Sequence, residues 1–471
     1  MTASTQKLPF FTKFSLGLGT VAFGIKDQGF NTLLMLYYNQ VVGLPAAWVG
    51  AAIMLTMVID AFADPLIGHW SDGLRSRWGR RHPFMYASAL PIGLLYFLLW
   101  SPPAAAPWIQ TVYLFAVSVG VRVSISCFEI PSYALTTELT SGYDERTSVA
   151  TYRAILYALG FVGLGAITYK TVMQATPENP VGQLNAAGYL HYAALAGPLM
   201  FLCVLAGTAG THNRIPTLRQ AEPDSTRGLQ ALLHEMRVVF FDRTLASLLL
   251  CAFFFAIVGG ISNTLGTYIF TYFWRFTPPE LATVTGAGGW GLILAMVIAG
   301  IARRFDKKHV ATLMYSGAIL TFTLPVVLGL LHLLPRDPAA SLRFVAFQYA
   351  LMIMCIIGGL ILLTSMVADV GDYFRLETGQ RMEGLMFAAL VMINKAVSGL
   401  GVFLSSLLLT AVDFPDKATP DTVPAATVDH LAWAYVISIV VFCGLAVICL
   451  ARYPISRAKH REILAGLGEN A

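Results

Sequence analysis

Residues 60–81 read DAFADPLIGHWSDGLRSRWGRR, in which two carboxylates lie inside an apolar run that is followed by four arginines. Residues at positions i and i+4 of a helix share one face, so Asp60 and Asp64 are predicted to point the same way. Apolar runs of about 20 residues, enough to span a bilayer as a helix, recur from one end of the chain to the other. Two acids inside such a span indicate an ion or substrate pathway.

The composition agrees with a membrane protein. Of 471 residues, 56% are hydrophobic and 12% are charged, and the mean hydropathy is +0.66, which is too apolar for a soluble globular protein. The apolar runs are continuous rather than alternating, which favours helices over a β-barrel. The net charge of +5 lies in short loops, so we predict no nucleic-acid partner. All six cysteines fall in apolar runs without a CxxC pair, so neither disulfides nor a zinc site is expected.

The apolar runs form twelve predicted spans in two halves. The spans cover residues 14–42, 46–70, 83–101, 108–138, 146–174, 187–209, 244–274, 280–303, 309–333, 342–371, 382–411 and 428–452. We therefore predict an all-α membrane protein with twelve transmembrane helices. It comprises an N-terminal six-helix half (residues 1–210), a cytoplasmic linker (residues 211–243), a C-terminal six-helix half (residues 244–455) and a cytoplasmic tail (residues 456–471). Related halves around a central site are the usual build of secondary transporters.

The distribution of Lys and Arg predicts the orientation. The loops after the second and eighth spans and the C-terminal tail are basic, whereas VVGLPAA (residues 41–47) and SPPAAAPW (residues 101–108) have no charge. By the positive-inside rule, both termini are predicted to be cytoplasmic. The protein is expected to lie in the plasma (inner) membrane.

Charged side chains inside the predicted spans are few. They are Lys26, Asp27, Asp60, Asp64, Arg122, Glu129, Arg153 and Lys395, and all but the last lie in the N-terminal half. Because an intramembrane charge is costly unless it is paired or hydrated, these residues mark the predicted path of an ion or a substrate.

The Asp60 and Asp64 pair has two chemical uses. With a hydroxyl such as that of Ser126 or Thr56, two carboxylates on one face form a hard-oxygen site for Na⁺. Alternatively, two adjacent acids repel each other, which favours protonation of one of them and suits H⁺ transport. A third interpretation is an ion pair between Asp64 and the arginines of the following loop.

A second polar group surrounds Pro131. Glu129 lies two residues before this proline, which is expected to disturb the helix and free a backbone carbonyl. With Arg153 available and the Tyr133 ring one turn on, the arrangement suits a polyhydroxylated ligand held by charge-assisted hydrogen bonds. The alternative is a Glu129–Arg153 pair that only holds two spans together. Arg122 either pairs with an acid across the cavity or extends outward.

Lys395 is the one basic residue in the middle of a C-terminal span. A lone ammonium there needs a carboxylate from the other half, and a link that changes with occupancy is what alternating access requires. The alternative is a lysine that faces a wet cavity without a coupling role.

A cytoplasmic gate is predicted from two charged segments. One is the arginine cluster after the second span, and the other is the loop MVADVGDYFRLETGQRMEG (residues 366–384), in which acids and bases alternate. Salt bridges between the segments are expected to form in one conformation and break in another, the alternative being a solvated loop. The predicted gate residues are Arg75, Arg77, Arg80, Arg81, Asp369, Asp372, Arg381 and Glu383.

Known catalytic motifs are absent from the sequence. There is no GxSxG, HExxH, Walker loop or Gly-rich dinucleotide fingerprint. We therefore predict a protein that is not an enzyme and that has no cofactor, only a coupling ion, Na⁺ or H⁺.

Several segments together resemble one family. They are GIKDQG (residues 24–29), DAFADPLIG (residues 60–68), RSRWGRRHP (residues 75–83), EIP (residues 129–131) and ADVGDYFRLETGQRMEG (residues 368–384), in order along nearly the whole chain. By these segments the chain is identified as a member of the glycoside–pentoside–hexuronide:cation symporter family of the major facilitator superfamily, the group that contains the sodium-coupled melibiose permease.

This resemblance implies a role for each of the intramembrane residues that match the family. It implies cation binding by Asp60, Asp64 and Ser126, and substrate binding by Lys26, Asp27, Glu129, Tyr133, Arg153 and Lys395. Ala63 stands where the melibiose permease has an asparagine linked to cation choice, which leaves Na⁺ and H⁺ as alternatives. Glu129 and Tyr133 replace Asp and Trp, so melibiose itself is not implied.

The segment CFEIPSYALTTELTSGYDERTSVATYR (residues 127–153) also resembles the animal sodium-dependent lysolipid symporters. Lys26, Asp27 and Glu129 favour a hydroxyl-rich substrate over a lysolipid. The predicted function is therefore cation-coupled symport of a sugar or glycoside by alternating access, with lysophospholipid symport as the alternative and a non-transporting membrane sensor or enzyme as the third. The expected partners are a small-molecule substrate and the lipid bilayer, and the protein is expected to be a monomer.

Overall fold

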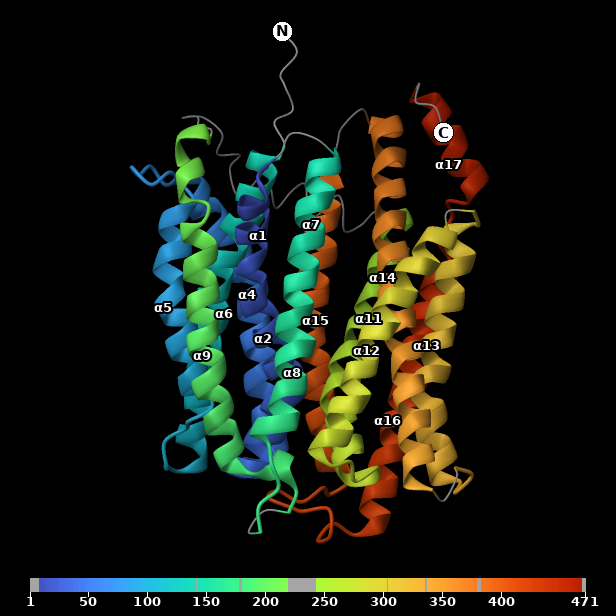
Figure 1. Cartoon of the computed structure of the whole chain (residues 1–471). Helices are drawn as coiled ribbons and strands as arrows, with labels where there is room; N and C mark the ends of the chain where they lie inside the picture. Colours follow the sequence, from blue (N-terminus) through green and yellow to red (C-terminus); the bar gives the residue numbers. More distant parts are fainter. Residues whose placement is uncertain are drawn as a thin grey trace. The chain divides into compact units, whose positions relative to one another are not determined.

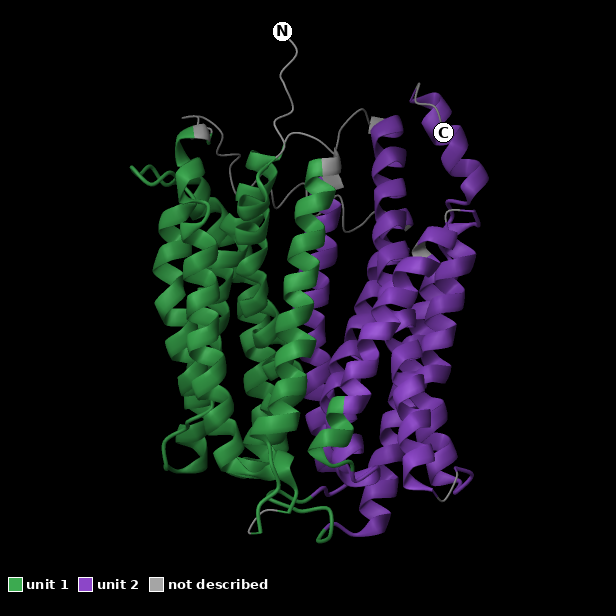
Figure 2. Cartoon of the chain, viewed as in Figure 1, with its two compact units in different colours: residues 1–225, 276–282, 415–422 green, residues 226–275, 283–414, 423–471 purple. Residues whose placement is uncertain are grey.

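The structure is a computed structural model (Figure 1) that describes residues 8–140, 143–177, 180–218, 243–302, 304–334, 337–378 and 383–467. Within these ranges the chain is helical and contains no strand. The predicted gate residue Arg381, the side chain of Glu383 and most of the predicted linker lie outside the described residues. The chain divides into two compact units (Figure 2): unit 1 comprises Met1–Ser225, Phe276–Ala282 and Pro415–Thr422, and unit 2 comprises Thr226–Arg275, Thr283–Phe414 and Val423–Ala471.

Unit 1 contains the first six predicted spans. The first is helical over residues 10–42 but is divided into α1 (Phe10–Leu18), α2 (Thr20–Gln28), the π-helix η1 (Gly29–Leu33), α3 (Leu34–Leu36) and the π-helix η2 (Tyr37–Val42). The next three are α4 (Ala46–Gly73), α5 (His82–Leu99) and α6 (Pro107–Leu139). The fifth combines α7 (Tyr143–Ala158), η3 (Leu159–Gly163), α8 (Leu164–Ile167) and η4 (Thr168–Val172), and the sixth is α9 (Ala186–Ala209), flanked by the short helices η5 (Gly182–Leu184) and η6 (His212–Thr217).

The remaining six spans belong mainly to unit 2. They are α11 (Arg243–Tyr268) with η7 (Ile269–Phe273), α12 (Pro278–Ala302), α13 (Lys307–Leu330), α14 (Pro338–Thr378), α15 (Glu383–Ala411) and α16 (Ala425–Ala451), and a short helix, α17 (Arg457–Gly466), follows them. In the described part of the chain, eleven helices are long and apolar enough to cross a membrane; the divided run over residues 10–42 corresponds to the remaining predicted span. The predicted bounds agree with these helices to within four residues except at the end of α14.

The predicted loop over residues 366–384 is wrong over its first part. Helix α14 continues to Thr378, seven residues beyond the predicted end of the span, so Asp372 lies on the same helix as Asp369. Val367, Val370 and Phe374 recur at helical spacing and are buried in the core of unit 2. This apolar stripe anchors an amphipathic extension of α14, and the charged residues lie between its members.

Glycines bring the first and fifth spans into backbone contact. A Cβ atom on Gly24 would lie 2.2 Å from the carbonyl oxygen of Tyr157, and one on Gly160 would lie 2.3 Å from that of Val21. No larger residue fits without moving a helix, so α2 packs directly on the chain at the junction of α7 and η3. This contact positions the polar residues of α2 beside those of α7.

Unit 2 repeats this contact between its first and fifth spans. A Cβ atom on Gly260 of α11 would lie 2.3 Å from the carbonyl oxygen of Ser398, and one on Gly401 of α15 would lie 2.4 Å from that of Ile257. The reciprocal glycine pair therefore occurs at the same place in both six-helix halves.

Candidate functional site

Asp60 on α4 is paired within unit 1. It is 3% exposed; Arg122 Nη1 donates to its Oδ2 at 3.0 Å, and the Ser126 hydroxyl donates to its Oδ1 at 3.0 Å. Arg122 and Ser126 are one turn apart on α6, so both reach the same carboxylate. Of the two sequence-based interpretations of Arg122, the structure therefore shows pairing with an acid.

The second acid of the pair, Asp64, lies one turn further along α4 and is half-buried. Thr56, which we considered as a hydroxyl ligand, donates its hydroxyl to the carbonyl oxygen of Ala52 at 2.8 Å. Ala63 supplies no side-chain oxygen beside the two acids. Among the hydroxyls considered, that of Ser126 is thus the one that bonds to a carboxylate of the pair.

Lys26 and Asp27 on α2 form an ion pair with each other. Lys26 Nζ lies 2.7 Å from Asp27 Oδ1, and the Tyr157 hydroxyl of α7 donates to Asp27 Oδ2 at 3.1 Å. Lys26 is buried and Asp27 is half-buried. The Asp27 carboxylate therefore has one oxygen held from its own helix and the other from the helix that Gly24 allows to approach.

A buried chain of hydrogen bonds fixes α2 from the other side. The Tyr96 hydroxyl of α5 donates to the carbonyl oxygen of Ile25 at 3.0 Å and lies 2.7 Å from the Tyr192 hydroxyl of α9, which donates to Gln28 Oε1 at 2.9 Å. These groups are fully or almost fully buried. Because both flanks of Asp27 are held, its backbone position is well defined before any ligand binds.

Arg153 on α7 is directed toward α6. It is 6% exposed, and its Nη1 donates to the Ser132 hydroxyl at 2.9 Å and to the carbonyl oxygen of Leu16 at 3.3 Å. Its guanidinium lies 4.0 Å from the centroid of the Tyr133 ring, in a cation–π contact. One face of the ring that we predicted for a sugar is therefore covered by Arg153, while the side chain of Tyr133 remains 51% exposed. Glu129 lies on the same helix, one turn before Tyr133, and is half-buried.

Two polar residues of this region were missed in the sequence. Tyr157 follows Arg153 by four residues and therefore shares its helix face, a spacing that could have identified it. Ser132 gave no comparable signal, because an uncharged hydroxyl next to a proline is common in membrane helices. The structure brings Lys26, Asp27 and Tyr157 together, and Arg153, Ser132 and Tyr133 together.

The predicted substrate residue Lys395 lies in unit 2, on α15, and is half-buried. The backbone carbonyl of Lys395 accepts a hydrogen bond from the Ser398 hydroxyl at 2.9 Å. Lys395 precedes the crossing point of α15 and α11 at Gly401 by six residues, so it lies near the closest contact between these helices.

Two of the four predicted gate arginines of unit 1, Arg80 and Arg81, are bound to acids of the same unit. Arg81 is 6% exposed, and its Nη2 lies 2.5 Å from Asp72 Oδ1 and 3.2 Å from Glu138 Oε1, at the end of α6. Arg80 Nη2 contacts the same Glu138 oxygen at 2.6 Å. Glu138 was not among the gate residues predicted from the sequence. The two other arginines of this loop, Arg75 and Arg77, are exposed.

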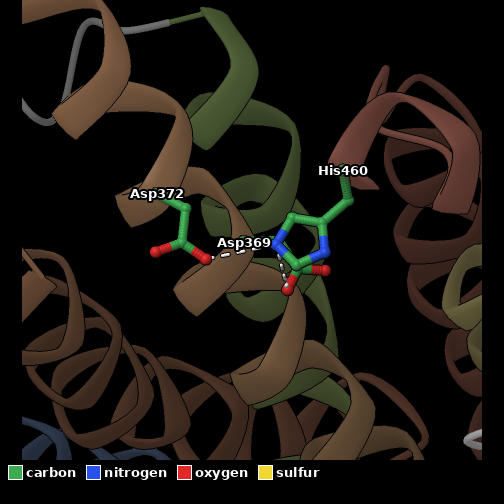
Figure 3. Close-up of side chains that lie close together, drawn as sticks. All are labelled: Asp369, Asp372 and His460. Carbon is green, nitrogen blue, oxygen red and sulfur yellow. Dashed lines mark hydrogen bonds and ion pairs between the residues drawn. The ribbon is translucent and has the colours of Figure 1, made fainter. Parts of the chain in front are cut away.

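The gate acids of unit 2 lie in a cluster with bases of the same unit. Lys307 Nζ lies 2.6 and 2.8 Å from the two oxygens of Asp369. Figure 3 shows the imidazole of His460, on α17, between Asp369 and Asp372; its Nε2 is 3.4 and 3.1 Å from their oxygens. The three side chains are close enough to share a metal ion, but an ion there would compete with Lys307 for both oxygens of Asp369. A cavity of about 460 Å³ adjoins this cluster.

Comparison with known proteins identifies the family. A family model described as MFS/sugar transport protein matches residues 15–457. The chain belongs to this family. Its members are transporters rather than enzymes, and the predicted assignment to the glycoside–pentoside–hexuronide:cation symporters of the major facilitator superfamily is confirmed.

Relatives match over nearly their full length. An isoprimeverose transporter from Lactiplantibacillus pentosus is 23% identical over 97% of this chain and 91% of its own length. A putative glycoside/cation symporter from Escherichia coli (strain K12) is 23% identical over 98% of this chain and 95% of its own. The crystal structure of a D-xylose-proton symporter is similar with a TM-score of 0.65 at 11% identity, covering 95% of this chain and 98% of that chain. The predicted fold, an all-α membrane protein of the major facilitator type, is thereby confirmed.

Proposed function

We propose that the protein is a symporter that carries a sugar or glycoside across the plasma (inner) membrane, coupled to Na⁺ or H⁺, with both termini cytoplasmic. The observation on which this proposal rests is the set of polar groups within the membrane-spanning part of unit 1. A carboxylate, an ammonium, a guanidinium and a phenol, from Asp27, Lys26, Arg153 and Tyr157, lie on two adjacent helices that cross at Gly24.

The hydrogen-bonding capacity of these groups suits a polyhydroxylated solute. A sugar hydroxyl both donates and accepts, so it can donate to Asp27 and accept from Arg153. In the described part of the chain, Nε and Nη2 of Arg153 are buried and have no hydrogen-bond partner, which leaves two charged donors for a ligand. Charge-assisted hydrogen bonds of this kind are about twice as strong as neutral ones and carry geometric specificity.

The relatives support the same substrate class. The isoprimeverose transporter and the putative glycoside/cation symporter are named for sugars, and the second is named for a cation as well. The lysolipid alternative gains no support from these relatives, and the charged groups of α2 and α7 do not favour it. The transport assay below includes a lysolipid to test this alternative directly.

The residues of unit 1 that we propose for the cation and for the solute lie on neighbouring helices, which suits symport. Asp60 and Ser126 connect α4 to α6, and α6 also bears Glu129, Ser132 and Tyr133. A ligand that changes the charge at Asp60 or Asp64 therefore acts on the helix that forms one wall of the solute site. Coupling is then the free energy by which one ligand strengthens the binding of the other.

The test is transport in liposomes. The full chain is reconstituted, gradients of Na⁺ or H⁺ are imposed separately, and uptake of a glycoside panel is compared with uptake of a lysolipid. We expect gradient-driven accumulation of at least one glycoside, its loss in Asp27→Asn, and retention in the matched control Asp337→Asn, whose carboxylate is exposed. Uptake of the lysolipid and of no glycoside would reject the proposal.

A further inference from the structure

The positive charge that neutralises the Asp60 carboxylate comes from the protein itself. Both of its carboxylate oxygens accept a hydrogen bond from α6, one from the Arg122 guanidinium and the other from the Ser126 hydroxyl, each at 3.0 Å. Asp60 is 3% exposed and Arg122 is 5% exposed. This is a buried and directly bonded ion pair at the position where the sequence predicted a coupling cation.

The guanidinium of Arg122 is held in place by packing. It lies 4.7 Å from the centroid of the Phe30 ring, which is 2% exposed. Phe30 belongs to the π-helix η1, an irregularity that is frequent at functional sites. Three elements, α4, α6 and η1, therefore enclose the charge pair, so Arg122 is not a surface side chain that moves aside at little cost.

A metal ion at Asp60 would meet this fixed charge. A cation bound to the carboxylate would lie about 4 Å from the guanidinium, and at the effective dielectric constant of protein sites the repulsion would lower its affinity by about a thousandfold. Moving Arg122 away instead would leave a buried, unpaired guanidinium, which is also strongly unfavourable. Ala63, one turn from Asp60 on the same helix, contributes no oxygen that would offset either effect.

We propose that Arg122 is a tethered counter-ion that occupies the Asp60 carboxylate in place of a metal ion, and that this chain does not bind Na⁺ at Asp60. Arg122 is thus a residue that determines ion specificity. If the protein is a symporter, as proposed above, then Na⁺ bound at Asp60 is not its coupling ion. Whether Na⁺ binds at Asp60 does not depend on which solute is transported.

The test is Na⁺ binding to the purified full chain. Thermal unfolding in detergent is followed at increasing NaCl, with choline chloride keeping the ionic strength constant, since a ligand that binds the folded state raises the melting temperature. We expect no Na⁺-specific rise for the wild type or for Arg122→Lys, a Na⁺-specific rise for Arg122→Gln, and its disappearance in the double variant Arg122→Gln/Asp60→Asn.

Two results would overturn the proposal. One is a Na⁺-specific rise in the wild type that Asp60→Asn abolishes, and this measurement is decisive even if Arg122→Gln does not fold. The other is a folded Arg122→Gln protein that does not respond to Na⁺. Glycoside uptake is measured separately in liposomes, so a protein that transports no glycoside would refute the proposed function while the Na⁺ titration still tests Arg122.

Discussion

The crossing of α2 and α7 gives a quantitative prediction for Gly24→Ala. The added methyl carbon would lie 2.2 Å from the carbonyl oxygen of Tyr157 and 2.6 Å from the backbone nitrogen of Phe161, and real Cβ atoms essentially never come closer than 3.0 Å to such atoms. Both neighbours are backbone, so the helices must separate by at least about 0.8 Å. A shift of that size stretches the 3.1 Å bond between Tyr157 and Asp27 beyond normal hydrogen-bond range.

The expected cost of Gly24→Ala is about 1–3 kcal/mol, as for other overpacked cores. The matched control is Gly163→Ala in η3, where the nearest atom to the new methyl group is a Leu159 side-chain carbon at 4.0 Å. There the change from Gly to Ala in a helix is expected to be neutral or to stabilise by up to about 1 kcal/mol. Thermal unfolding of both variants in one detergent, together with glycoside affinity, provides the comparison.

A Gly24→Ala protein that unfolds at the same temperature as Gly163→Ala, or above it, would refute the predicted overpacking. A Gly24→Ala protein that is destabilised but binds glycoside as tightly as the wild type would show that the helix contact does not position Asp27. Gly260→Ala in α11, whose methyl group would lie 2.3 Å from the carbonyl oxygen of Ser398, should destabilise unit 2 in the same way.

Three further predictions follow from the site and its surroundings. Tyr157→Phe removes a hydrogen bond to the Asp27 carboxylate, worth about 1.5–3 kcal/mol, so glycoside affinity should fall about tenfold or more in a binding assay. The control Tyr152→Phe, on the same helix, should bind glycoside normally. Equal affinities of the two variants would show that Tyr157 has no positioning role. Glu138→Gln removes the anion that Arg80 and Arg81 share. It should lower the free energy of unfolding by about 3 kcal/mol, measured by thermal unfolding. An unchanged melting temperature would contradict this prediction. Burial raises the pKa of Asp416 above its usual 3.8. The protonated carboxyl therefore contributes to stability below pH 3.8, and this contribution is lost as the pH rises through the folded-state pKa. Asp416→Asn should flatten this part of the curve of melting temperature against pH, and identical curves for the variant and the wild type would refute the raised pKa.

Most of the fold could be predicted because a membrane imposes a length on every span. Each helix must cross a hydrocarbon layer of about 30 Å. The apolar runs therefore end where the helices leave that layer. Two features were not predicted. The first is the division of the first span by the π-helices η1 and η2, for which the apolar run gave no signal. The extension of α14 was missed because its alternating charges suggested a loop, although Val367, Val370 and Phe374 already showed a helical period.

The candidate site was less predictable than the fold. The residue types were visible in the sequence, since a charge in a membrane span needs a reason. Their partners were not, because pairing depends on how neighbouring helices are rotated about their axes. Arg122 and Glu129 are seven residues apart on α6 and share roughly one face, yet it is Arg122 whose pairing with Asp60 decides the charge of the predicted cation site. The assignments of cation, substrate and gate residues remain predictions.

The two halves repeat their scaffold, and this comparison gives Lys395 a structural context. The glycine pair that joins the first and fifth spans recurs between the seventh and eleventh. Measured from that crossing, Arg153 lies seven residues before Gly160, and Lys395 lies six residues before Gly401. A base therefore occupies nearly the same position on the equivalent helix of each unit. The two bases thus share a similar level relative to the crossing, although one residue of difference in spacing turns their side chains about 100° apart around the helix axis. The repeat therefore makes Lys395 a candidate by its level in the helix, and a test of Lys395 by substitution is warranted beside that of Arg153.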